Sequence, residues 1–586
     1  MPVPTTYPIG GRGASDGLRR EVRPPNLAFM TRTLRTSFPR IAAGTLLALV
    51  LLGFPGQAAA QSSRAGAAGA SPYLPLDHWA YPALELWIAR GDVTSLSPMT
   101  RPYRIADVVG AVDGLRREDL SGAEQGLRAR LLAELGPDPD EGRDRKRRTR
   151  RSRSARHQGQ GNARSSGEAL VLEVGLEAGA RYVTQTHPDP LQPVLDGRFG
   201  NDRVLEGLEA SVRGSSPYVA GAASLRHDGI YRHDPRFPDG RVTPPRDGPF
   251  LDENLSLRLE EAYVEAQIPY LRLSIGRLDR DWGPATIDGF VRSAQTYSQD
   301  EIGYRFGIER IFLIGTIGAP GDFGGDTVRH LSMHRLEVRP SDRLAFAISE
   351  AALHGGPDGR FRFELANPVG IWQLALDDED VAYNKVGQLD AWWRAARGVT
   401  LNGSLLADAT GGGQSCCQMG GSLGIELTRL APGLRVGGQI SAIQSLTYRT
   451  FRPWEEYSID GVGLGWDKSD LRLVSLEADW FASPSLVLSP RLDFQRRGEG
   501  DFRQPRPPPS ELTDQPDILS GIVETTVRPA LGGRWTPAGR LRITAEWDAG
   551  VSLISDYANV EGDDRTELTG SFAIRLFAPR LVFLVR

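Results

Sequence analysis

From residue 168 to the end of the chain, apolar and polar residues alternate with a period of two. The clearest stretch is residues 541 to 553, LRITAEWDAGVSL, in which apolar side chains occupy the odd positions. Similar patterns occur in residues 172–182, 262–268, 423–427 and 474–480. Such alternation predicts β-strands with one apolar and one polar face, although soluble sandwiches show it as well.

The lengths of the connections separate a membrane barrel from a sandwich. Tight breaks occur near residues 214–217, 269, 340–342, 397–398, 432–433, 483–485, 537–539 and 579. Long polar stretches lie between them, at 187–201, 227–254, 280–300, 352–382, 408–420, 447–468, 497–517 and 555–566. Outer-membrane barrels alternate short periplasmic turns with long extracellular loops. For residues 168–586 we therefore predict an all-β transmembrane β-barrel of 16–18 antiparallel strands. Eighteen strands are favoured, and one further hairpin is expected in residues 308–339.

Residues 61–136 carry the apolar period of helices. Leu84, Trp87 and Ile88 fall at positions i, i+3 and i+4, with Pro82 near the expected start and Gly91 just past the expected end. The pattern predicts a small N-terminal α-helical domain, which we expect in the periplasm. The arginine-rich residues 137–167 have no apolar period, which predicts a basic, disordered linker.

The longest apolar run is residues 41–54. Arg32, Arg35 and Arg40 precede it, and an alanine-rich cleavage site ending at Ala60 follows. These features predict a secretory signal peptide over residues 1–60, too short for a transmembrane helix. Because Met30 would begin a signal of ordinary length, residues 1–29 are interpreted as a mis-assigned translation start. The expected destination is the outer membrane, with the long loops extracellular.

Composition and motifs exclude several functions. The formal net charge is −4, so nucleic acid is not an expected partner. Cys416 and Cys417 form no disulfide framework, and residues 377–380 are acidic but lack calcium-loop spacing. Residues 420–424 match G-x-S-x-G but continue as a strand instead of turning into a helix. We expect no enzyme, no cofactor and no metal site.

A polysaccharide site needs flat apolar faces for the sugar rings and polar groups for the hydroxyls. The predicted outer loops offer such side chains in two groups. The candidate polysaccharide-binding residues are Arg280, Asp281, Trp282, Trp454, Glu455, Glu456 and Tyr457. Two alternatives stay open: Trp454 and Tyr457 as part of an interfacial aromatic girdle, and Trp282 as turn packing.

Charged residues on the predicted strands are expected to point into the barrel as opposite-charge pairs. On the lipid face each would cost about 2–4 kcal/mol at mid-depth. The residues are Arg181, Glu265, Arg472, Glu477, Arg542 and Glu546.

Specific segments resemble the capsule assembly Wzi family. Residues 270–306, YLRLSIGRLDRDWGPATIDGFVRSAQTYSQDEIGYRF, resemble its G-R-x(n)-W-G-P segment. HRLEVRPSDRLAFAISEAALHG, ELANPV and LNGSLLAD follow in the family's order, and YLPLDHWAYPALELWIARG resembles its N-terminal helical region. The resemblance covers roughly residues 73–586 apart from the linker. It implies an 18-stranded outer-membrane barrel with a periplasmic helical bundle that attaches capsular or other surface polysaccharide without catalysis.

We therefore expect a monomeric, non-enzymatic outer-membrane protein that contacts lipid and anchors or helps assemble capsular polysaccharide. A porin for sugars or other polar solutes is the alternative, because barrels of this size can leave a channel. The helical region also resembles an S-layer homology motif at His78-Trp79-Ala80 and Thr100-Arg101, which would imply binding of cell-wall polymers.

Overall fold

The computed structural model describes most of the chain after the predicted signal peptide. The described residues are 69–136, 170–184, 204–228, 257–321, 327–357, 359–367, 383–410, 418–459, 461–508, 517–537, 542–578 and 581–585. The predicted signal peptide and basic linker, both cysteines and the acidic run at 377–380 lie outside them. Ala65–Arg586 form one compact unit. Within the described parts, no helix has the length and apolar character needed to cross a membrane.

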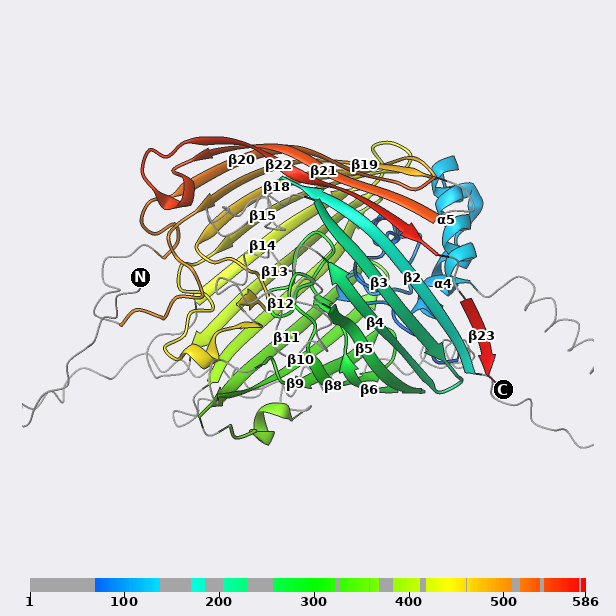
Figure 1. Cartoon of the computed structure of the whole chain (residues 1–586), viewed down its shortest axis with the longest axis horizontal. Helices are drawn as coiled ribbons and strands as arrows, with labels where there is room; N and C mark the ends of the chain where they lie inside the picture. Colours follow the sequence, from blue (N-terminus) through cyan, green and yellow to red (C-terminus); the bar gives the residue numbers. More distant parts are fainter. Residues whose placement is uncertain are drawn as a thin grey trace, which may run out of the picture. The chain divides into compact units, whose positions relative to one another are not determined.

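The strands form a closed antiparallel barrel with 18 positions in its wall (Figure 1). The last position is shared by two strands, because β22 pairs with residues 177–183 of β2 and β23 pairs with residues 170–174. The strands of the wall are β2 Leu170–Val183, β3 Val204–Ser215, β4 Val219–Asp228, β5 Leu257–Ile268, β6 Leu271–Arg277, β8 Asp300–Gly307, β9 Ile311–Gly318, β10 Val328–Ser341, β11 Leu344–Gly356, β12 Tyr383–Ala396, β13 Val399–Thr410, β14 Gln418–Leu427, β15 Leu434–Ile443, β18 Leu471–Ser483, β19 Leu486–Arg497, β20 Glu524–Trp535, β21 Arg542–Ser555, β22 Arg565–Phe577 and β23 Leu581–Val585. The predicted barrel, and the favoured strand number, are confirmed.

The connections alternate in length as expected. The short turns include those between β10 and β11, between β12 and β13, and between β18 and β19. The additional hairpin expected in residues 308–339 consists of β9 and β10, which pair from Ile311↔Val338 to Gly318↔Leu331. The short turn before this hairpin, at residues 308–310, joins β8 to β9. It was absent from the tight breaks identified in the sequence.

The strands mostly place apolar side chains outward and polar side chains inward, except where helices and loops pack against the wall. In β5, Val264 and Ile268 are exposed on the outer face, whereas Glu265 and Gln267 are buried on the inner face. Of the six charged strand residues expected to point inward, Arg472 does not. It is exposed and shares a face with the exposed Leu476, one residue after β18 begins, where a guanidinium can reach past the apolar band.

The N-terminal region contains three α-helices, as predicted. They are α3 Tyr81–Arg90, α4 Ile105–Asp113 and α5 Gly122–Leu135, with the 3-10 turn η1 Arg117–Asp119 before α5. Helix α3 ends at Gly91, whose φ of 88° allows its N–H to bond Trp87 O and Ile88 O. Helix α5 begins with a capping box, in which Ser121 and Glu124 satisfy each other's backbone N–H groups.

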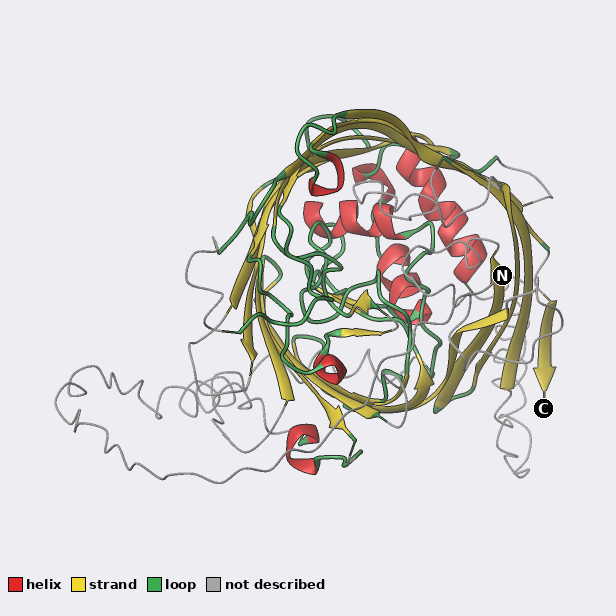
Figure 2. Ribbon diagram, turned by 60° about the vertical axis from the view of Figure 1, so that its left-hand side comes forward, coloured by secondary structure: helices red, strands yellow, loops and turns green. Residues whose placement is uncertain are grey.

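The helices lie inside the ring of strands (Figure 2). Their apolar residues form one buried cluster with the inward side chains of Ala345, Ala347, Trp392 and Phe481. They occupy the short-turn end of the barrel: Gly126 of α5 lies so close to Pro484, in the β18–β19 turn, that an added Cβ would overlap the ring. The helical region predicted over residues 61–136 is therefore packed against the inner wall of the barrel.

Candidate functional site

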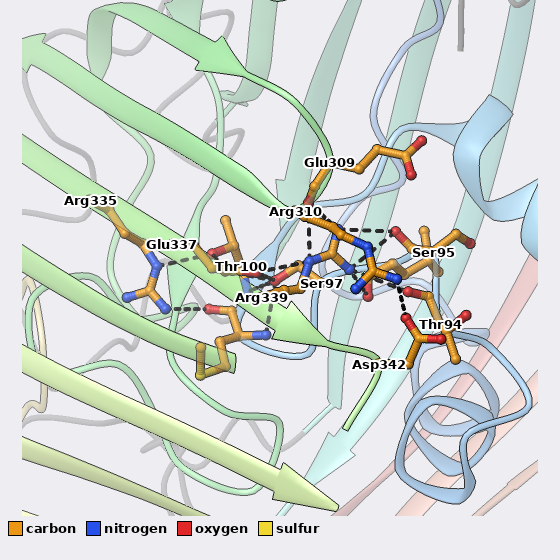
Figure 3. Close-up of polar contacts among 12 residues, drawn as sticks. Thr94, Ser95, Ser97, Thr100, Glu309, Arg310, Arg335, Glu337, Arg339 and Asp342 are labelled. Atoms are coloured by element: carbon orange, nitrogen blue, oxygen red, sulfur yellow. Dashed lines mark hydrogen bonds and ion pairs between the residues drawn. The ribbon is translucent and has the colours of Figure 1, made fainter. Parts of the chain in front are cut away.

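The segment before α4 is fixed to the inner face of β10 by buried charges (Figure 3). Arg335 is fully buried and donates to Met99 O at 3.0 Å, to Thr100 Oγ1 at 2.9 Å and to Asp390 Oδ2 at 2.7 Å. Two residues along β10, Glu337 accepts hydrogen bonds from Ser97 Oγ at 2.7 Å and from Thr100 Oγ1 at 2.6 Å.

Arg339, the next inward residue of β10, donates to Leu96 O at 2.9 Å. The alternating residues of HRLEVR therefore form a column that holds residues 96–100. Because these groups are desolvated, each depends on its partner more strongly than a surface ion pair would.

A second ionic cluster joins α3 to the wall. Arg101 donates to Glu85 at 2.9 Å and to Asp281 at 2.5 Å. Arg435 of β15 pairs with Glu426 at 2.8 Å and lies 4.0 Å from Glu85. Burial raises the pKa of Glu85 to about 7, although Arg435 and Arg101 oppose the shift.

The tryptophan-glycine-proline segment lies inside the barrel and is not exposed. Asp281–Trp282 form the short strand β7, which pairs with β1, Thr100–Arg101, of the N-terminal region. Trp282 has no exposed surface. Gln388 of β12 spans the segment, since its Nε2 donates to Trp282 O at 2.7 Å and its Oε1 accepts from Val291 N at 2.7 Å. Arg280 pairs with Glu301 at 2.6 Å.

The second group of candidates, residues 454–457, lies in the β15–β18 loop and packs into the same interior. That loop contains η5 Pro453–Glu455, β16 Ser458–Ile459 and β17 Val462–Gly463. Tyr457 is fully buried, donates to Val291 O at 2.8 Å, and stacks on Tyr448 with ring centroids 5.4 Å apart. Tyr448 in turn donates to Phe290 O at 2.7 Å.

The wall also holds this loop through its backbone carbonyls. Arg329 of β10 donates to Trp454 O at 3.1 Å and to Glu456 O at 2.5 Å, and Asn384 of β12 donates to Glu455 O at 3.0 Å. Burial raises the pKa of Glu455, against the opposing effect of Arg452, which pairs with it at 2.8 Å.

The structure thus brings the two predicted groups together, but not as an exposed surface. Five of the seven candidates are buried: Arg280, Asp281, Trp282, Glu455 and Tyr457. Trp454 and Glu456 are partly exposed. The expectation of open outer loops at these positions is wrong, because the loops fold back into the barrel. The packing alternative holds for Trp282, and Tyr457 belongs to no outer girdle. Whether any of the seven contacts a sugar stays a prediction.

Sequence reasoning missed the residues that hold these loops, among them Gln388, Tyr448, Arg329 and Arg335. The arginines carried a usable signal, because polar residues at alternate strand positions face the lumen. Gln388, two residues before Asp390 on the same face of β12, carried the same signal, whereas Tyr448 lies in a loop and carried none. Among the described residues, no group of three or more His, Cys, Asp or Glu side chains is placed to hold a metal ion.

The architecture defines a class: a closed β-barrel of the outer-membrane kind whose interior is largely filled by N-terminal helices and inward-folded loops. In fold the chain is similar to Wzi from Escherichia coli, described as an outer membrane protein involved in group 1 capsule assembly and as a carbohydrate binding β-barrel. The two are 13% identical; the match covers 87% of this chain and 99% of Wzi, with a TM-score of 0.56.

Two Pseudomonas aeruginosa proteins match this fold more weakly. OpdL is 10% identical, with 72% of this chain and 100% of OpdL covered and a TM-score of 0.41. OpdQ is 10% identical, with 72% and 98% covered and a TM-score of 0.37. No protein-family model and no curated protein matches the sequence.

Proposed function

We propose that this protein is a non-enzymatic outer-membrane protein that holds capsular or other surface polysaccharide at the cell surface. The observation that carries the proposal is an aromatic and arginine surface at the long-loop end. Phe451 is half-exposed, Arg452 beside it is exposed, and the Arg506 guanidinium lies 5.6 Å from the Phe451 ring centroid. A flat ring stacks on a sugar face, and guanidinium groups bind carboxylates and hydroxyls. An acidic polysaccharide fits this chemistry best.

The surface is held rigidly by contacts between the two loops that form it. Arg506 N donates to Thr450 O at 2.8 Å, and Arg449 donates to Pro505 O at 2.6 Å. Deeper down, Asp470 accepts hydrogen bonds from Gly500 N at 2.9 Å and from Ser520 Oγ at 2.5 Å. Ordering of the loops is therefore complete before a ligand arrives, which reduces the entropic cost of binding.

The proposed orientation follows the rule that short turns face the periplasm and long loops face outward. The helices at the short-turn end then lie on the periplasmic side of the barrel, and the Phe451 surface faces the medium. The similarity in fold to Wzi supports this proposal, because that protein is described as binding carbohydrate.

The test compares cells that produce the wild-type protein, no protein, or the double variant Phe451→Ala/Arg452→Gln. Deletion and the double variant are both expected to release polysaccharide into the medium while total synthesis is unchanged. Tyr218→Ala is the matched control, since Tyr218 is an exposed aromatic at the short-turn end. The proposal fails if cell-bound polysaccharide is the same in all four strains.

A porin is the second candidate, and one observation favours it. Three inward charges of β20 and β21 are partly hydrated, although Arg528 beside them is buried: the Asp548 side chain is 40% exposed, and Arg534 and Glu546 are 26% and 27% exposed. A water-filled passage along this wall would conduct ions. Steady current through planar bilayers would favour the porin, and silence would favour the polysaccharide-holding barrel.

A further inference from the structure

Part of the loop between β11 and β12 packs against the outside of the barrel. Its described part, residues 359–367, is called the outer strap and contains η3, Phe363–Ala366. Figure 2 shows this helix outside the ring of strands, and in Figure 1 it is the green helix beyond the wall. Leu365 is buried in a cluster with Ala352 and Tyr383. Both of those side chains point outward, because they alternate with inward residues of β11 and β12.

The wall beneath the outer strap explains why the strap lies there. The outward residues His330 of β10 and His354 of β11 are imidazoles, where a lipid-facing wall normally presents apolar groups. The strap covers them: the Phe361 ring centroid lies 5.3 Å and 6.0 Å from the two imidazoles. Arg362 N donates to His354 Nε2 at 3.2 Å, and a ring nitrogen of His330 contacts Gly359 O at 3.2 Å.

The solvent-accessible surface of the outer strap combines rings with positive charge, and the Glu364 carboxylate lies 3.7 Å from the Arg362 guanidinium. Its sequence is Arg360-Phe361-Arg362-Phe363. Phe363 is 75% exposed and Phe361 is 43% exposed, and both arginine side chains are accessible to solvent. Gly359 lies against Val328, an exposed apolar residue at the loop end of β10, so the surface continues the apolar band of the barrel.

We propose that the outer strap binds phosphate-bearing lipids of the surrounding leaflet. Guanidinium groups pair bidentately with phosphate oxygens, and aromatic rings prefer the boundary between headgroups and acyl chains. The strap offers both at the loop end of the wall, with the arginines alternating with the rings. A polysaccharide does not fit as well, because the strap lies on the outer wall of the barrel, beside the exposed apolar Val328. This site lies on the outer wall, apart from the Phe451 surface; it rests on the orientation given with the proposed function, but not on polysaccharide binding.

Native mass spectrometry of the detergent-purified full chain tests the proposal, with bis-phosphorylated lipid A and its dephosphorylated form as probes. The wild type is expected to retain the phosphorylated probe preferentially. Arg360→Gln/Arg362→Gln should weaken that retention by about tenfold or more, since each lost charge-assisted contact is of that order. Phe363→Ser should weaken retention of both probes.

Arg472→Gln is the matched control, because Arg472 is another outward arginine near the loop end of a strand. It should change retention less than about twofold. Heat-modifiable gel mobility verifies that every variant forms the barrel. Equal retention of the two probes by the wild type would overturn the proposal. So would undiminished retention by the double arginine variant, or an equal loss in Arg472→Gln.

Discussion

Charged side chains that point into the barrel are accommodated differently on two sides of its interior. On the side of β10 and β12, Arg335 and Asp390 are completely buried as a pair, and Arg335 bonds the N-terminal segment. On the side of β20 and β21, Arg534 and Glu546 keep about a quarter of their side chains exposed. An inward charge in a barrel is therefore not one kind of feature. Against the N-terminal segment, a charge such as Arg335 is a specific structural partner, whereas Arg534 and Glu546 belong to a partly hydrated lining; Arg528 of β20 is the buried exception on that side.

Arg335→Ala tests the dry side and should have the largest effect. It leaves the Asp390 carboxylate and Met99 O buried with fewer partners, which costs about 3–5 kcal/mol. The midpoint of the heat-dependent shift in gel mobility should fall sharply. Arg534→Ala is the matched variant on the hydrated side, expected to cost about 0–1 kcal/mol. Equal shifts for both would show that the two sides do not differ.

Trp282→Ala should destabilise the barrel nearly as much, by about 3–5 kcal/mol, because it empties a fully buried ring site. Phe451→Ala removes a half-exposed ring and should change stability by less than about 0.5 kcal/mol. The same thermal assay measures both. If Trp282→Ala proved as mild as Phe451→Ala, the buried loops would not contribute to the core as described.

Tyr457→Phe tests how much a single buried hydrogen bond between two loops contributes to stability. It leaves Val291 O without its side-chain donor in a buried site, at a cost of about 1–3 kcal/mol. Tyr182→Phe, on an exposed ring of the outer face, serves as the reference and should be neutral. A neutral Tyr457→Phe would mean that the two loops do not depend on each other.

Glu85 predicts a pH dependence with the smallest effect. Its folded pKa is raised to about 7 by burial, so the folded state binds its proton more tightly than the unfolded state does. Stability from this group is fully present below about pH 4.5 and declines as pH rises to about 7, by less than about 1.4 kcal/mol per pH unit. Glu85→Gln should flatten that decline. Parallel pH profiles for the wild type and the variant would contradict the shift.

Much of the fold follows from local pattern. Alternation in residues such as Val264 to Ile268 assigns one face to lipid and one to the interior, and the lengths of the connections indicate a barrel. The helices were also predictable, because Gly91 and Ser121 act within their own turns of chain. Arg472 shows the limit of this reasoning: its alternation was clear, but its place at the strand end decided where its charge could go.

The sequence by itself determined the strands, the helices and the class of barrel, because each depends on neighbouring residues in the chain. Only the tertiary structure decided that Trp282 and Tyr457 are buried together, and that Phe451, in the same loop as Tyr457, is half-exposed. Gln388 donates to Trp282 O and Tyr457 donates to Val291 O, each across more than a hundred residues, and the accepting carbonyl groups have no signature in the sequence. Closure of the barrel brings those groups within reach, which is why the site could not be read locally.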